Sequence, residues 1–281
     1  MTDARASQAG SSSSPVPRRL VVHGAAGRMG RRIVACAAGE PAAWRIVGAL
    51  EAAVHPRTGD DAGTLAGVPA LGVAVGDSWS GDADVVIDFS LPGAVAAIAA
   101  LSAERGIPLV VATTGLEPAD QAAIRAAARR IAVLQAPSMS LAVNVAMDLV
   151  ARAGALLQST GERVDVEIVE CHHRHKEDAP SGTALRFGSL VHEALGGGGV
   201  THGREGRPGA RPAGEIGYHA VRAGDNPGEH TILFGLDGES LAVNVRATSR
   251  DCYARGALAA AAFLVGRPAG LYSMADVLGL G

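Results

Sequence analysis

Lysine is almost missing from this chain of 281 residues. Lys176 is the only lysine, and arginine supplies every other basic side chain. Aromatic residues make up only 3% of the chain, and adjacent arginines occur only in pairs such as Arg18-Arg19. Proteins that bind nucleic acid usually carry clustered basic residues and aromatic stacking surfaces. With a net charge of −3 as well, the composition argues against a nucleic-acid partner.

Cysteine and long apolar runs are scarce too. The three cysteines, Cys36, Cys171 and Cys252, lie far apart without a C-x-x-C pair, which indicates a reducing compartment. No apolar run reaches the ~18 residues that span a membrane. Residues 1–17 are rich in serine and proline and lack the apolar segment of a signal peptide, so they predict a disordered tail. We therefore expect a cytoplasmic protein without a membrane partner.

What the chain does contain begins with a glycine-rich turn. The apolar run over 18–23 leads into G-A-A-G-R-M-G, Gly24 to Gly30, and a helical pattern follows. Small residues let a backbone approach a pyrophosphate, and the start of a helix favours its negative charge. The next strand, over 45–50, ends at Glu51, about 20 residues further on, where dinucleotide-binding folds place an acid on the adenosine ribose. Together these segments predict a nucleotide-binding unit.

Strands and helices alternate after a polar, glycine-rich loop over 52–82 that holds one short strand near 72–75. We expect strands at 85–89, 107–112 and 131–135, and helices at 94–105 and 118–130. This alternation predicts an α/β fold with a Rossmann-type, doubly wound parallel sheet and ligands at the carboxyl ends of its strands. The turns at 90–92 and 113–115 are expected at such ends, where each either borders the cofactor or serves only as a turn.

The pattern changes after Pro137. A helix is expected over 143–157, and residues 164–170 then alternate with apolar side chains at even positions, as in a sheet with one open face. A helix ending at Leu195 and strands at 217–222, 229–234 and 241–247 follow. This predicts a second, α+β domain with an open mixed sheet, a kind of surface that is often buried in an oligomer. The last helix, over 254–264, is apolar all round and is expected to pack on the first domain.

The stretch from Glu170 to Ala184, E-C-H-H-R-H-K-E-D-A-P-S-G-T-A, predicts the chemistry. It places three histidines beside the single lysine. An ammonium group can donate a proton where a guanidinium group cannot, and imidazole exchanges protons near neutral pH. Ser181 then begins a helix whose free amide groups can bind an anion. The stretch indicates acid–base chemistry on a carboxylate or phosphate substrate.

Two other interpretations apply to the same stretch: a metal site, or a solvated loop without a role. Metal sites usually include a further Cys, His or carboxylate at a recognisable spacing. Cys171 does not fill that place, because strand alternation points it away from His172. The single lysine and the anion-binding turn favour acid–base catalysis, and we expect no metal.

The combined motifs resemble the dihydrodipicolinate reductase family, from about Leu20 to the C-terminus. The stretch from Glu170 to Ala184 is the most specific part, and G-A-A-G-R-M-G, V-R-A-G-D, G-E-H-T and S-M-A-D-V-L support it. The resemblance implies NAD(P)H-dependent reduction of 4-hydroxy-tetrahydrodipicolinate, a small cyclic dicarboxylate, in lysine and diaminopimelate synthesis. It also implies a dinucleotide-binding domain over 18–141 and 251–281, a substrate-binding and oligomerisation domain over 142–250, and a homotetramer formed through that second domain.

The resemblance assigns roles as well. His172 is the expected general acid/base and Lys176 the expected proton donor, with either able to deliver the proton. His173, Gly182 and Thr183 are expected to bind the substrate. The expected cofactor-binding residues are Gly24, Ala25, Ala26, Gly27, Arg28, Met29, Glu51, Ala112, Thr113, Thr114, Ala136, Pro137, Ser138 and Met139.

Three departures from the family pattern concern the cofactor. Ala52 stands where members often carry an arginine after the ribose-binding acid, so we expect NADH to be preferred and NADPH to remain possible. The turns over 112–115 and 137–140, expected on the nicotinamide side of the cofactor, also differ from the family pattern, which is consistent with altered kinetics or with a divergent substrate. The alternatives are a reductase or dehydrogenase of another amino or imino acid, and a non-catalytic dinucleotide sensor, which the intact H-H-R-H-K stretch disfavours.

Overall fold

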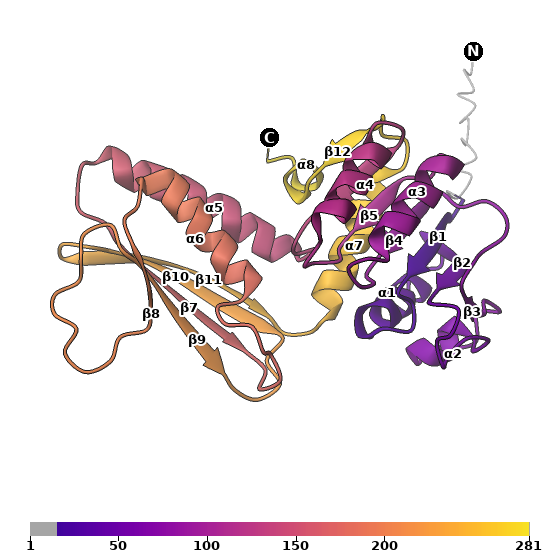
Figure 1. The fold of residues 1–281 in the computed structure, drawn as a ribbon, viewed down its shortest axis with the longest axis horizontal. Coiled ribbons are helices and arrows are strands. Elements are labelled where there is room, and N and C mark those ends of the chain that lie inside the picture. Colours follow the sequence, from indigo (N-terminus) through magenta and orange to yellow (C-terminus); the bar gives the residue numbers. More distant parts are fainter. Residues whose placement is uncertain (1–15, 281) are drawn as a thin grey trace, which may run out of the picture.

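The computed structural model describes residues 16–280, which form two lobes joined by two short crossings of the chain (Figure 1). The tail predicted for residues 1–17 lies outside the described residues, apart from its last two. One lobe is built on a seven-stranded sheet and the other on a five-stranded sheet. The fold class expected from the sequence is confirmed.

The first lobe holds a parallel sheet in the order β12-β6-β5-β4-β1-β2-β3. Its strands are β1 (Arg18–His23), β2 (Trp44–Leu50), β3 (Val75–Gly76), β4 (Val85–Asp88), β5 (Leu109–Val111), β6 (Ala132–Gln135) and β12 (Gly270–Tyr272). The strand order reverses between β1 and β4, which are hydrogen-bonded neighbours. Such a reversal opens a crevice at the carboxyl ends of the strands, where open α/β sheets bind their ligands.

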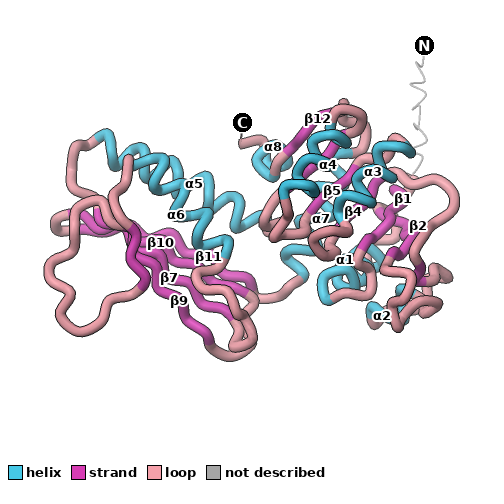
Figure 2. The backbone as a smooth tube through the Cα atoms, viewed as in Figure 1, coloured by secondary structure: helices cyan, strands magenta, loops and turns pink. Residues whose placement is uncertain are grey.

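Helices cover both faces of this sheet (Figure 2). They are α1 (Arg28–Ala38), α2 (Ala62–Ala66), α3 (Val95–Arg105), α4 (Pro118–Ala128), α7 (Asp251–Leu264) and α8 (Met274–Leu278). α1 and α7 pack on one face of the sheet and form one hydrophobic core with it. α3 and α4 pack on the other face and form the second core. The last long helix thus packs on the first lobe as expected, although it is not apolar all round, because Arg255 is exposed and pairs with Glu40 at 3.3 Å.

The second lobe has a mixed sheet in the order β11-β10-β7-β9-β8. Its strands are β7 (Asp165–His172), β8 (Val200–His202), β9 (Ile216–Arg222), β10 (Gly228–Leu236) and β11 (Glu239–Ala247), and its helices are α5 (Leu141–Ser159) and α6 (Gly182–Leu195). Both helices lie on one face of the sheet and leave the other face open (Figure 1). Along β7 the even positions are buried, as the alternation predicted.

α5 is the one described helix that is long and apolar enough to cross a membrane by length and composition. Asp148 and Arg152 interrupt its apolar sequence and pair with each other at 2.8 Å. α5 also packs on α6 and β11 and contributes Val143, Ala146 and Val150 to the core of the second lobe. Only 22% of its apolar window is buried, so these contacts cover one side of α5.

The chain crosses between the lobes twice, and α7, which follows the second crossing, packs against the first. Residues 136–140 lead from β6 into α5, and Ser140 caps α5 by accepting a hydrogen bond from the amide of Val143 at 3.3 Å. Residues 248–250 lead from β11 back into α7. On α7, a Cβ at Gly256 would come within 1.7 Å of the carbonyl oxygen of Met139, so only glycine fits this contact. The close approach fixes the start of α7 against the first crossing.

Candidate active site

A cleft of about 820 Å³ lies between the two lobes. From the first lobe it is lined by the glycine turn, Glu51 and the ends of β4, β5 and β6, and from the second by residues of the histidine-rich stretch. Among the residues expected at the site, it brings together Gly24, Gly27, Arg28, Met29, Glu51, Ala112, Thr113, Thr114, Pro137, Ser138, Met139, His172, His173, Lys176 and Thr183. Ala25, Ala26, Ala136 and Gly182 do not line it, and Ala25 and Ala136 are buried.

The glycines of the turn have separate physical roles. Gly24 has a φ of +78°, and a Cβ there would lie 2.4 Å from the carbonyl oxygen of Phe89. A Cβ at Gly30 would lie 2.0 Å from the carbonyl oxygen of Gly24, so Gly30 lets α1 pack closely on the turn. α1 begins at Arg28; its N-cap residue, Gly27, provides no side-chain cap, and its first turn carries no acid. Its first amide groups, with Arg28 beside them, therefore suit a pyrophosphate.

Glu51 belongs to the same turn. One of its carboxylate oxygens accepts a hydrogen bond from the amide of Ala26 at 2.8 Å, and its other oxygen has no partner among the described residues. That second oxygen is available to a ribose hydroxyl group. A 2′-phosphate on that ribose would need a cation nearby, but Arg57, the next arginine after Glu51 in the sequence, pairs with Asp60 at 3.3 Å. Arg28 remains as the arginine of the glycine turn that lines the cleft.

A buried carboxylate ties three strand ends together beneath the cleft. Asp88, at the end of β4, accepts hydrogen bonds from the hydroxyl groups of Ser90 and Thr113, both at 2.6 Å, and from His23 Nδ1 at 2.7 Å. Thr113 Oγ1 in turn accepts the amide of Ser90 at 3.0 Å. His23 and Asp88 were not among the residues expected at the site. The sequence feature that could have identified them is an ionisable residue at the carboxyl end of each of two buried strands.

The catalytic candidates come from the end of β7 and the loop after it. His172 is buried, and its Nδ1 forms a hydrogen bond with the Glu170 carboxylate. Lys176 Nζ pairs with both carboxylate oxygens of Asp178, at 2.8 and 2.9 Å. His173 Nδ1 is shielded from solvent and has no hydrogen-bond partner among the described residues. An unpartnered buried nitrogen is costly unless a ligand supplies its partner.

Burial shifts the pKa values of the two histidines in this region. Burial lowers the pKa of His172, and the hydrogen bond to Glu170 opposes that effect. Burial, followed by the charge of Arg250, lowers the pKa of His173. Both rings are therefore favoured in the neutral form, which can accept a proton or a hydrogen bond.

The predicted helix start is confirmed. α6 begins at Gly182, and Ser181 caps it by accepting a hydrogen bond from the amide of Ala184 at 3.2 Å. The cap engages one amide group, and the first turn carries no acid. The amides of Gly182 and Thr183 have no hydrogen-bond partner among the described residues and suit a substrate carboxylate, and Thr183 lines the cleft.

No group of three or more His, Cys, Asp or Glu side chains with metal-site geometry occurs among residues 16–280. The side chains of Cys171 and His172 lie on opposite faces of the sheet, because successive residues alternate along β7. The absence of a metal from the chemistry stays a prediction.

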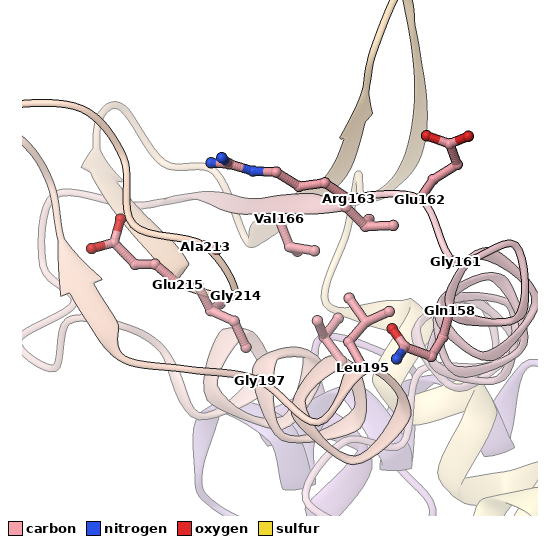
Figure 3. A pocket seen from close by; sticks show the side chains of 13 residues that line it. Gln158, Gly161, Glu162, Arg163, Val166, Leu195, Gly197, Ala213, Gly214 and Glu215 are labelled. Carbon is pink, nitrogen blue, oxygen red and sulfur yellow. The ribbon is translucent and has the colours of Figure 1, made fainter.

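A second pocket, of about 350 Å³, lies at the far end of the second lobe (Figure 3). Val166 and Leu195 point into it, while Glu162 points outward. None of the residues expected at the active site lines this pocket. The expected catalytic and substrate-binding residues that line a pocket are therefore found in the cleft between the lobes.

The fold and the cleft define an oxidoreductase of the dinucleotide-binding α/β class. The family described as "Dihydrodipicolinate reductase, N-terminus" matches residues 18–139, and "Dihydrodipicolinate reductase, C-terminus" matches residues 142–278. The chain belongs to the dihydrodipicolinate reductase family. The resemblance seen in the sequence is confirmed.

Curated relatives and a solved structure agree with this assignment. The chain is 50% identical to the 4-hydroxy-tetrahydrodipicolinate reductase of Rhodopirellula baltica, over 94% of this chain and 97% of the relative. It is 49% identical to the enzyme of the same name from Anaeromyxobacter sp., over 93% and 97%. A dipicolinate-bound dihydrodipicolinate reductase from Paenisporosarcina sp. has the same fold, with a TM-score of 0.69 at 21% identity over 92% of this chain and 98% of that one.

Proposed function

We propose that this chain reduces 4-hydroxy-tetrahydrodipicolinate to tetrahydrodipicolinate with a nicotinamide dinucleotide, as a cytoplasmic enzyme of diaminopimelate and lysine synthesis. One observation carries the proposal. A single cleft joins an uncapped glycine turn on one lobe to His172, His173, Lys176 and Thr183 on the other. The relatives of about 50% identity bear the name of this activity.

The dinucleotide fits the first lobe. The free amides at the start of α1 would hold its pyrophosphate, Glu51 its adenosine ribose, and residues 112–114 and 137–139 would border its nicotinamide end. When bound, the dinucleotide supplies the hydride. The pair of Glu51 and the neutral Ala52 supports a preference for NADH over NADPH.

The second lobe handles the substrate and the proton. The amides of Gly182 and Thr183 would hold one carboxylate, and His173 Nδ1 would gain the partner it lacks in the free protein. Overall, the substrate gains a hydride and a proton and loses its hydroxyl group as water. Lys176, whose ammonium group can leave Asp178 for the substrate, or His172 delivers that proton.

The assembly and the domain division follow from the same fold. We assign residues 18–141 and 251–281 to the dinucleotide-binding domain and residues 142–250 to the substrate-binding domain. We also propose that the chain forms a homotetramer through the open face of the second sheet. Val169 on β7 and Val221 on β9 are exposed on that face and support its burial between copies.

The test is oxidation of NADH, followed at 340 nm, when substrate freshly formed from pyruvate and aspartate semialdehyde is added. We expect turnover that depends on both substrate precursors, and loss of that turnover in the Lys176→Ala variant. Turnover with another amino or imino acid and none with this substrate would instead support the alternative reductase. Binding of NADH without any turnover would support a sensor.

A further inference from the structure

Glu170 is a buried carboxylate whose two oxygens are both fully used. Oε2 accepts hydrogen bonds from His172 Nδ1 and from Arg222 Nη1, the latter at 2.8 Å. Oε1 accepts from Arg222 Nη2 at 2.8 Å and from the amide of Ser181 at 3.1 Å. Four donors from three separate segments therefore converge on one side chain that does not itself line the cleft.

Arg222, the partner of Glu170, holds the loop that carries the lysine. Its guanidinium group donates to the carbonyl oxygen of Lys176 at 3.3 Å and to that of Asp178 at 2.6 Å. The register of the sheet brings it there, because Arg222 on β9 lies opposite His172 on β7. The pair Glu170–Arg222 thus connects the imidazole, the lysine loop and the start of α6.

The ionisation of Glu170 decides which nitrogen of His172 carries the proton. Burial acts to raise the pKa of Glu170, but the hydrogen bonds from Arg222 and His172 outweigh it and lower that pKa. An ionised carboxylate only accepts hydrogen bonds, so His172 Nδ1 must carry a proton. In the neutral ring Nε2 is then left as the base, and it lies beside Gly228, where a Cβ would come within 3.0 Å of it.

We propose that Glu170 is a positioning residue for catalysis: it fixes His172 in the Nδ1-protonated tautomer, with Nε2 as the atom that exchanges the proton, and it stabilises the imidazolium that forms. The inference rests on the proposed function. It adds a residue that acts through His172 and does not touch substrate or cofactor. Carboxylates play this part for other catalytic histidines.

Several titratable and charged groups around His172 affect its pKa. They are Glu170 on its own strand, Lys176 on the loop, Arg222 on β9, and His230 on β10 with ring centroids 5.1 Å apart. Tyr253 on α7 lies across Gly228. Of these groups, Glu170 alone raises the pKa of His172, while the charges of Lys176 and Arg222 lower it.

The first measurement needs no substrate. Long-range ¹H–¹⁵N NMR of the full chain distinguishes a protonated from an unprotonated ring nitrogen, and assignment of His172 uses the His172→Gln variant. We expect His172 to be protonated at Nδ1 and unprotonated at Nε2 near neutral pH. A neutral ring protonated at Nε2 would overturn the proposal whether or not the chain reduces the proposed substrate.

The second measurement compares Glu170→Gln with Glu167→Gln. Glu167 lies on the same strand and also pairs with arginines, but it points to the opposite face of the sheet. We expect Glu170→Gln to lower kcat about 10- to 1,000-fold, within the range of general acid–base catalysis. The limb of its pH–rate profile that reports His172 should move to lower pH, whereas Glu167→Gln should leave both unchanged.

The Glu170→Gln variant leaves the partly buried Arg222 without its charge partner and can fail to fold. The double variant Glu170→Gln/Arg222→Gln removes both charges and restores a neutral site, so the same tautomer and pH measurements apply to it. An unmoved pH limb together with a fall in kcat of less than about threefold, in whichever of the two variants folds, would refute the positioning role. Absence of turnover in the wild type, with the expected tautomer intact, would count against the proposed function alone.

Discussion

Replacing Ala52 by arginine should make NADPH a much better cofactor. Glu51 offers one free carboxylate oxygen to the adenosine ribose, and a 2′-phosphate placed there meets a like charge. Arg57 cannot help without leaving Asp60, and Ala52 itself is exposed and neutral. An arginine at position 52 lies next to Glu51 and can reach the phosphate, as in enzymes that take NADPH.

The size of the effect follows from one charge-assisted hydrogen bond. Such a bond contributes about 1.5–3 kcal/mol, and each 1.4 kcal/mol is a factor of ten. The Ala52→Arg variant should therefore gain roughly 10- to 100-fold in kcat/KM for NADPH. Because position 52 is exposed to solvent, the lower end of that range is expected and the gain should shrink as salt is added. The change should appear in KM, since the phosphate lies far from the hydride.

The assay is steady-state turnover with NADH and NADPH on one preparation of each protein. Ala52→Gln serves as the matched control, because it offers hydrogen-bond donors on a long side chain without the charge. The reasoning is refuted if the wild type already uses NADPH as well as NADH, since another cation, with Arg28 the first candidate, must then neutralise the phosphate. An equal gain with Ala52→Gln would show that charge is not the cause.

Three further predictions concern the proton donor, the buried histidine and metals. Lys176→Ala should lower kcat by about 10²- to 10⁴-fold and hardly change the Kd for NADH, and a fall of less than about threefold would remove Lys176 from the mechanism. Burial lowers the pKa of His230 to about 4 from 6.5, so the folded state should lose up to about 3 kcal/mol of stability as pH falls through that interval. In urea unfolding at pH 7 and pH 5, the free energy of unfolding of His230→Asn should change less between the two pH values than that of the wild type. An equal change in the two proteins would contradict this account. Exhaustive chelation should leave activity and Tm unchanged, whereas stoichiometric zinc whose removal abolishes activity would establish a metal site.

Local sequence features predicted most of the scaffold. The glycine turn, the alternation along β7 and the serine that begins α6 each depend on neighbours within a few residues, and each was found where expected. The short elements α2, β8, β12 and α8 were missed, because three to five residues are too few to show a period. Strand and helix ends differed by up to a few residues for the same reason.

The supporting side chains could not be placed from sequence, because they meet only through the sheets. Alternation in β7 puts Glu170 on the buried face, which marks it as an ionisable residue in need of a partner. That the partner is Arg222 depends on the register of β9, 52 residues away. His23 and Asp88 likewise meet because β1 and β4 are neighbours, a consequence of the strand order rather than of any local pattern.

The single lysine gives the protein an unusual chemical handle. Apart from the amino group at the start of the chain, Lys176 is the only primary amine, and it lies in the cleft with part of its side chain accessible. A reagent that acylates amines can therefore label the interior at one position, and ligands that fill the cleft should protect it. Mass spectrometry of one arginine-bounded peptide would then count occupied active sites directly, without any turnover assay. The same scarcity means that each copy of this proposed enzyme of lysine synthesis withdraws one lysine from the cell's supply.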